Sequence, residues 1–202
     1  MRCYKGDNMQ VKKDDIQNKI LTVSERMFIK NGYENTSLKM IADKSYISKS
    51  NIYRYYKSKD EIYETLVGPA RNEILKLTTV FFTDDFIGKY TPDKCEEVSS
   101  ILASVFSEYR SGVLVALRSS TGTDRKLVEQ TIIAKFIEAC PIYDEDTKEM
   151  ISKLLIYGIT EILLKHSDKE SIERELKALI YYHYLGLNGL KNILGVGEIV
   201  KS

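Results

Sequence analysis

Residues 36–62 read TSLKMIADKSYISKSNIYRYYKSKDEI. Apolar residues recur three and four positions apart in this stretch, which is the spacing of a helix rather than of a strand. Thr36 is placed to cap a first short helix, and Ser48 is placed to cap a second one after a tight turn. Ser58 and Glu61 form a capping box that begins a longer helix. The stretch therefore predicts two short helices joined by a turn and followed at once by a longer helix.

Positive charge is concentrated in the same stretch. Residues 36–59 hold six Lys or Arg side chains and one Asp, a net charge of +5, whereas the whole chain has 30 Lys and Arg against 29 Asp and Glu, a net charge of +1. A short helix held by a longer one can enter the major groove of DNA, which is about 12 Å wide. The pattern therefore predicts a DNA-binding helix-turn-helix, with residues 48–56 as the helix that enters the groove.

The residues ahead of this stretch predict a supporting helix at about 14–31. Its apolar residues form one stripe, Asp14 or Asp15 can cap its start, and Gly32 stands where helices commonly end. The domains expected from the sequence are a flexible arm at 1–13, a DNA-binding domain at 14–66 and an effector-binding and dimerisation domain at 67–202.

The remainder of the chain is also expected to be helical, which makes the fold class all-α. The chain of 202 residues contains only three prolines, and the apolar spacing of three and four continues to its C-terminal part. Gly68–Pro69 predicts a kink or a break, which is either a hinge or a simple helix end. The helical segments expected beyond it lie at about 93–111, 113–120, 124–140, 144–166 and 169–192.

The composition excludes several classes of protein. Apolar residues make up 43% of the chain and charged residues 29%, but no apolar run approaches the roughly 18 residues of a membrane helix, so we expect a cytoplasmic protein with no membrane partner. The three cysteines form no CxxC and the two histidines no HxxxH, which predicts neither a metal nor a cofactor. Motifs such as a P-loop, GxSxG or HExxH are missing, so the chain is not expected to be an enzyme.

Preceded by FIKNGYENTS, the stretch closely resembles the DNA-binding segment of TetR-type transcriptional regulators. The matching residues are Phe28, Gly32, Thr36, Ile41, Ala42, Ile47, Ser48, Tyr53, Tyr55, Tyr56 and Lys59. The resemblance covers about 14–66, and the remainder matches only in length and helical character. Two residues depart from the pattern: Tyr46 stands where a Gly is common, which implies either a strained left-handed turn or a different turn, and Tyr55 stands where a His is common.

The resemblance implies roles for residues of the helix-turn-helix. A threonine at position 36 would cap the first short helix and touch phosphate, and Lys49, Ser50 and Asn51 would meet base edges. Phe28 and Tyr56 fit the small core instead. The alternative for each exposed residue is a solvated helix surface. The DNA-contacting residues expected in this way are Thr36, Ser37, Lys49, Ser50, Asn51, Tyr53, Tyr55 and Lys59.

Regulators of this type pair two domains across a palindromic operator, so the resemblance also implies a homodimer. The last two expected helices carry apolar stripes that suit a four-helix bundle made by two subunits, and the alternative is burial within one subunit. The interface residues expected on these stripes are Ile151, Leu155, Gly158, Ile162, Leu176, Ile180, His183 and Leu187.

The middle helices of the family enclose a small-molecule cavity, which here would lie within about 93–140. Its candidate lining residues are Phe106, Tyr109, Arg110, Arg118, Phe136 and Tyr157. The leading prediction is a homodimeric repressor that binds double-stranded operator DNA and is released by an unknown small-molecule effector. The alternative is a DNA-bound adaptor or activator whose C-terminal domain binds a protein partner.

Overall fold

The computed structural model describes residues 5–81, 91–118, 130, 134 and 144–193. This part of the chain is helical and contains no strand, which confirms the all-α fold class. Its helices are α1 (Lys5–Asn31), α2 (Leu38–Ser45), α3 (Lys49–Ile52), α4 (Lys59–Phe81), α6 (Pro92–Glu108), α7 (Arg110–Arg118), α9 (Glu145–Lys165) and α10 (Lys169–Ile193).

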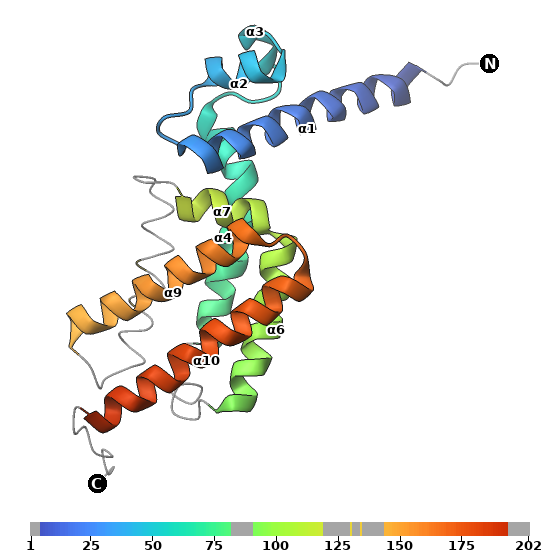
Figure 1. Cartoon of the computed structure of the whole chain (residues 1–202). Coiled ribbons are helices and arrows are strands. Elements are labelled where there is room, and N and C mark those ends of the chain that lie inside the picture. The colour runs from blue at the N-terminus through green and yellow to red at the C-terminus, as the bar shows by residue number, and fades with distance from the viewer. Residues whose placement is uncertain (1–4, 82–90, 119–129, 131–133, 135–143, 194–202) are drawn as a thin grey trace.

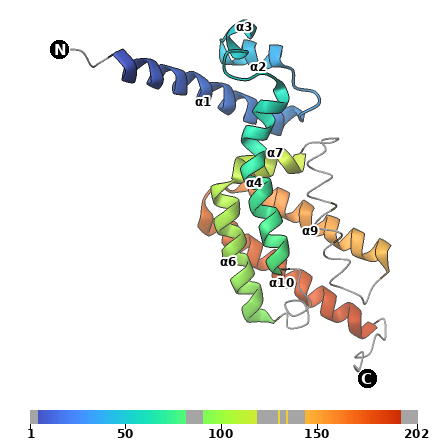
Figure 2. The ribbon, with the colours of Figure 1, turned by 180° about the vertical axis from the view of Figure 1, so that it is seen from behind.

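Helices α1, α2 and α3 form a head at one end of the molecule (Figure 1). Helix α4 begins in the head and runs into the other part, where α6, α9 and α10 lie (Figures 1 and 2). Helix α7 packs against α1, α4 and α9, so it lies where the head meets the C-terminal part.

Each part has its own apolar core. The core of the head includes Phe28, Ile41, Ile52 and Tyr56, all of them almost completely buried, so the structural role predicted for Phe28 and Tyr56 is confirmed. The second core is built from α4, α6, α7, α9 and α10. Helix α7 contributes to both, because Val115 and Ala116 belong to the head core while the leucines and Val113 of α7 belong to the second.

Side-chain caps fix the ends of the C-terminal helices. The carboxylate of Asp144 accepts a hydrogen bond from the backbone N–H of Thr147 at 2.8 Å, and Asp168 does the same for Ser171 at 2.8 Å. The segments predicted at 144–166 and 169–192 are therefore confirmed to within about one residue.

The predicted start of α1 is wrong. The helix begins at Lys5, so residues 5–13 are helical and not part of a flexible arm. No proline precedes α4 in the sequence, and Asp14 and Asp15 cost a helix interior only a few tenths of a kcal/mol each. The carboxylates that were expected to cap the helix therefore lie within it. The segment predicted at 124–140 lies outside the described residues, apart from Gln130 and Ala134.

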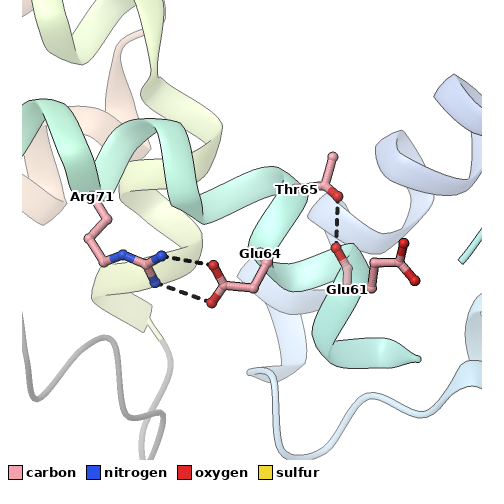
Figure 3. A network of polar contacts seen from close by, with 4 residues as sticks. All are labelled: Glu61, Glu64, Thr65 and Arg71. Carbon is pink, nitrogen blue, oxygen red and sulfur yellow. Dashed lines mark hydrogen bonds and ion pairs between the residues drawn. The ribbon is translucent and has the colours of Figure 1, made fainter. Parts of the chain in front are cut away.

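The break predicted at Gly68–Pro69 is also wrong, because α4 continues through both residues to Phe81. Pro69 has no N–H to donate to the carbonyl of Thr65 four positions earlier. The side chains of Glu64 and Arg71 span this point in a bidentate ion pair, with distances of 2.8 and 3.2 Å (Figure 3). The bidentate pair adds a side-chain link across the turn that lacks a backbone hydrogen bond.

Helix α7 approaches α4 so closely that only glycine fits. A Cβ built on Gly112 would lie 2.4 Å from the carbonyl oxygen of Leu66 and 2.8 Å from the Cβ of Ala70. The neighbouring Ser111 hydroxyl donates to the carboxylate of Glu25 at 2.6 Å, which links α7 to α1. Gly112 therefore sets the distance at which the C-terminal part packs on the head.

In the described residues no single helix is long and apolar enough to cross a membrane. Helices α6 and α7 pass that test together by length and composition, but they meet at 89° and bury most of their apolar residues in the protein core.

Candidate nucleic-acid interface

Ser37, not Thr36, caps α2. The hydroxyl oxygen of Ser37 accepts a hydrogen bond from the backbone N–H of Met40 at 3.2 Å, and Ser37 is exposed. Thr36 is 1% exposed, and its hydroxyl donates to the carbonyl of Gly32 at 2.8 Å. The prediction that the Thr36 side chain touches phosphate is therefore wrong, because its hydroxyl holds the end of α1 instead. Ser37 is the residue at the surface.

Helix α3 is short but well capped. The Ser48 hydroxyl oxygen accepts from the backbone N–H of Asn51 at 3.3 Å, which confirms Ser48 as the cap. The predicted helix at 48–56 is α-helical only from Lys49 to Ile52, and beyond it the N–H groups of Arg54 and Tyr55 bond three residues back. Buried Ile52 anchors this turn in the head core.

The outer face of α3 presents the side chains that were predicted to reach DNA. Lys49 and Ser50 are exposed, and Asn51 is half-buried. Tyr53 is 48% exposed, and the Lys49 ammonium lies 5.9 Å from the centre of its ring. Tyr55 is half-buried and packs against the head core. The structure thus brings the predicted base-contacting residues and Tyr53 onto one short surface.

Lys59 does not point its charge outward. Its ammonium donates to the carbonyl of Tyr33 at 2.7 Å and lies 3.9 Å from the centre of the Tyr33 ring. Burial lowers the pKa of Lys59, while nearby Asp60 acts against this shift. The Tyr33 hydroxyl donates to the carboxylate of Asp60. The pKa of Tyr33 is raised, mainly by burial and to a smaller extent by this hydrogen bond. The ammonium of Lys59 therefore joins the start of α4 to the turn between α1 and α2.

Replacing Lys59 with alanine is expected to lower the free energy of unfolding by about 1–2 kcal/mol, since the charged hydrogen bond to Tyr33 is lost. The slope of DNA affinity against salt should stay unchanged. Denaturant unfolding and a binding series at several salt concentrations measure the two effects. A lower salt slope with unchanged stability would show that the ammonium contacts phosphate after all.

Some exposed cations of the head were counted in the sequence as charge but not given a role. Lys39 lies exposed in the first turn of α2, next to the Ser37 cap, and Arg54 lies exposed just after α3. Their positions in the sequence could have identified them, because each lies one or two residues from a predicted DNA contact. Both extend the basic surface around α3.

Tyr46 forms the turn between α2 and α3 with a left-handed backbone, φ 55° and ψ 37°. Such a backbone costs a residue with a Cβ about 1–2 kcal/mol, and glycine avoids this cost. Of the two turns that the sequence allowed here, the strained left-handed one is present.

The predicted dimer-interface residues are divided between the core and the surface. Leu176, Ile180 and Ile162 belong to or pack against the core of their own subunit. A Cβ built on Gly158 would lie 2.8 Å from a side-chain carbon of Leu179 in the same chain. For Leu176, Ile180 and Ile151, which are buried in their own subunit, the prediction of a contact between subunits is wrong. For Gly158 and Ile162, which are half-buried, it stays a prediction. Leu155, His183 and Leu187 are half-buried.

The two arginines among the predicted effector-pocket residues bond to backbone carbonyls at helix ends. Arg110 donates through Nε to the carbonyls of Leu163 and His166, both at 2.9 Å, and so caps the end of α9. Arg118 donates to the carbonyl of Ile29 at 2.8 Å, at the end of α1.

The remaining candidates differ in how deeply they are buried. Phe106 lies in the second core, and Tyr109 packs against it. Tyr157 is 66% exposed. Phe136 lies outside the described residues. Because much of 93–140 lies outside the described residues, the shared pocket stays a prediction.

The described residues contain no group of three or more His, Cys, Asp or Glu side chains that could hold a metal ion. The candidate site consists of the hydroxyls of Ser50 and Tyr53, the amide of Asn51 and the ammonium of Lys49, on and directly after the short capped helix α3. These groups can donate to phosphate oxygens and to base edges.

Comparison with known proteins places the head in a family. Residues 20–66 match the model of the bacterial regulatory proteins of the tetR family. A TetR-family transcriptional regulator from Bordetella parapertussis 12822 has a similar fold, with 16% identity and a TM-score of 0.53 over 85% of this chain and 96% of that one. A TetR-like transcriptional regulator from Rhodococcus sp. RHA1 is 16% identical over the same shares, with a TM-score of 0.49.

None of the curated proteins matches the sequence. The match to the family model covers the whole helix-turn-helix and parts of its two supporting helices, from Ile20 in α1 to Leu66 in α4. The fold shared with the Bordetella regulator extends beyond that match to the C-terminal helices. Residues 20–66 therefore form a DNA-binding helix-turn-helix domain of the kind found in the tetR family of bacterial regulatory proteins.

Proposed function

We propose that the protein is a cytoplasmic, homodimeric repressor that binds a palindromic operator through α3 and is released by a small molecule bound in its C-terminal domain. The observation that carries the proposal is the tetR-type head with Lys49, Ser50 and Tyr53 on the outer face of α3. One head reads one half-site, and two heads related by two-fold symmetry read both halves, about 34 Å apart.

An apolar stripe on the outer face of α9 supports the dimer. Met150, Leu154 and Tyr157 are 54, 55 and 66% exposed and follow one another at helical spacing. They line an open trough of about 580 Å³ whose other lining residues, Asp146, Glu149 and Lys153, carry charges of both signs. Exposed stripes of this kind mark interaction surfaces, and a second copy of the chain can match both the apolar and the charged residues.

Helix α10 adds exposed apolar residues near the end of the described part, among them Tyr182 at 72% and Leu185 at 55% exposure. Helices α9 and α10 pack against each other within the subunit. In the proposed dimer, these two helices from each subunit form the four-helix bundle, and the contact residues lie one or two positions away from those predicted in the sequence.

Replacing Leu154 with arginine is expected to convert the dimer into monomers without lowering the free energy of unfolding of the subunit, because Leu154 is exposed. Leu176→Ala serves as the contrast. Leu176 is completely buried in its own subunit, so this change should cost about 2–5 kcal/mol of stability. Sedimentation velocity and denaturant unfolding measure the two effects. If L154R remains dimeric at micromolar concentration, the stripe on α9 is not the interface.

Release by a ligand needs a path from the C-terminal domain to the head, and α7 offers one. Ser111 bonds to Glu25, Arg118 bonds to the carbonyl of Ile29, and Gly112 fits against Leu66. A ligand that binds more tightly when α7 is displaced would shift α1 and α4 and change the spacing of the two heads.

A reporter gene placed behind the DNA upstream of the chain's own gene tests the sign of regulation. Repression predicts that expression rises when the protein is removed, and that the K49A variant behaves like the deletion. Expression that falls when the protein is removed would indicate an activator.

The alternative of a DNA-bound adaptor or activator draws on the same stripe on α9, because exposed apolar residues also suit a protein partner. It predicts that L154R abolishes activation while the oligomeric state of the free protein stays the same as in the wild type. Sedimentation of L154R therefore separates the two functions.

A further inference from the structure

The turn of the helix-turn-helix carries a feature that the fold itself does not require. Tyr46 is the one non-glycine residue with positive φ among the residues that the structure describes. Strain of this kind persists where a side chain has a role, since glycine would remove it.

Packing does not account for a tyrosine at this position. Tyr46 is 90% exposed, so its ring is not part of the head core. Its backbone N–H caps the end of α2 by bonding to carbonyls of Ala42 and Asp43, and any residue other than proline could supply that N–H. The side chain is therefore available for a contact outside the subunit.

A cation is held beside the ring. The ammonium of Lys19, on α1, lies 5.8 Å from the centre of the Tyr46 ring, within the range of a cation–π contact. The same pairing occurs on α3, where the ammonium of Lys49 lies 5.9 Å from the ring of Tyr53. Each pair places a positive charge and a phenolic hydroxyl together at the surface of the head, and the phosphate group accepts from both.

Tyr46 and the Lys49–Tyr53 pair are close in the chain. Tyr46 stands two residues before the Ser48 cap of α3, and Lys49 follows that cap directly. Lys19 extends the pair from the turn onto α1, which packs against α2 in the head (Figure 1). A contact made here would lie beyond the part of the groove that α3 itself enters.

We propose that Lys19 and Tyr46 form a second DNA-backbone contact, outside α3, that binds a phosphate of the operator. The strained tyrosine holds its hydroxyl outward, and the ring keeps the Lys19 ammonium beside it. This inference rests on the DNA-binding role of the head. It adds affinity for duplex DNA of any sequence and no preference between bases.

Tyr46→Gly separates this role from a structural one, because the two effects have opposite signs. Glycine relieves the left-handed backbone, so the melting temperature should rise by roughly 2–4 °C. Loss of the phosphate contact should weaken binding about tenfold, equally for the duplex upstream of the gene and for a shuffled duplex. Fluorescence anisotropy at several salt concentrations and thermal unfolding by circular dichroism measure these effects on the full chain.

Two further variants test the ammonium of Lys19 and the hydroxyl of Tyr46 separately. Lys19→Ala should lower the slope of log affinity against log salt by about 1, and Tyr46→Phe should keep the ring and the strain but lose the hydroxyl contact. Lys165→Ala is the control, since Lys165 is an exposed cation in the last turn of α9, in the C-terminal part. It should change neither affinity nor slope.

A Y46G protein that is more stable and binds both duplexes as tightly as the wild type would overturn the proposal. So would a K19A protein with an unchanged salt slope. If the wild type binds no duplex even at low salt, the DNA-binding role itself fails. If the wild type binds and the Y46G variant binds equally well, only the contact through Lys19 and Tyr46 fails.

Discussion

Replacing Gly112 with alanine is expected to lower the free energy of unfolding by about 3 kcal/mol. The added Cβ would lie 2.4 Å from the backbone oxygen of Leu66 and 2.8 Å from the Cβ of Ala70, and neither atom belongs to the end of a flexible side chain. Helices α4 and α7 must therefore separate. For a chain of this size, the melting temperature should fall by roughly 6–12 °C, which circular dichroism measures directly.

Gly186→Ala is the matched control for this prediction. Gly186 lies inside α10, and a Cβ built on it meets nothing within 4 Å. Alanine is favoured over glycine within a helix by about 0.5–1 kcal/mol, so this variant should be slightly more stable than the wild type. If both alanine variants change stability in the same direction and by the same amount, the close contact of α7 with α4 does not exist as described.

Replacing Lys49 with alanine is expected to weaken binding to the specific operator by about 1–3 kcal/mol, which is roughly 5- to 150-fold. Lys49 is exposed and follows the Ser48 cap, so its ammonium can reach guanine O6 or N7. Base preference should relax at one position of each half-site. Anisotropy against operator duplexes with single substitutions measures both effects.

Lys39→Ala provides the comparison, because Lys39 is also exposed but lies in the first turn of α2. It should weaken operator and shuffled duplex alike and lower the salt slope by about 1, which is the behaviour of a phosphate contact. Equal effects of K49A and K39A on base preference would remove the distinction between base and backbone contacts.

Features fixed by neighbouring residues could be predicted from the sequence. Ser48 caps α3 as expected, and Asp144 and Asp168 cap the starts of the two C-terminal helices, which lie close to their predicted positions. Ser58 accepts from the backbone N–H of Glu61 at 3.1 Å, which is one half of the predicted capping box, while the Glu61 carboxylate accepts from the N–H of Lys57 and not from that of Ser58. In each case the partners lie three residues apart, so the pattern itself contains both halves of the contact.

Features fixed by distant residues could not be predicted in this way. Thr36 and Ser37 are both suitable caps, and the choice depends on the carbonyl of Gly32, which takes the Thr36 hydroxyl. Arg110 and Arg118 suit a ligand pocket by type, but they bond to carbonyls 53 to 89 positions away in the chain. Sequence spacing gives no information about such partners.

The proposed dimer face shows how an offset of one residue in the apolar pattern can mislead. Helix α9 has apolar residues on more than one side, so Ile151 and Leu155 fit one stripe and Met150 and Leu154 fit another, rotated by one residue. One residue corresponds to about 100° around a helix. Only the packing of α9 on its own core shows that Met150 and Leu154 are the exposed pair.

The most direct test of this account is fluorescence anisotropy of the full chain with the duplex from just upstream of its gene and with a shuffled duplex, across a salt series. We expect tight binding that depends on sequence, with two subunits on each operator and a steep loss of affinity as salt rises. Equal and weak binding to both duplexes at all salt concentrations, with no sign of a fixed stoichiometry, would contradict the proposed operator-binding dimer.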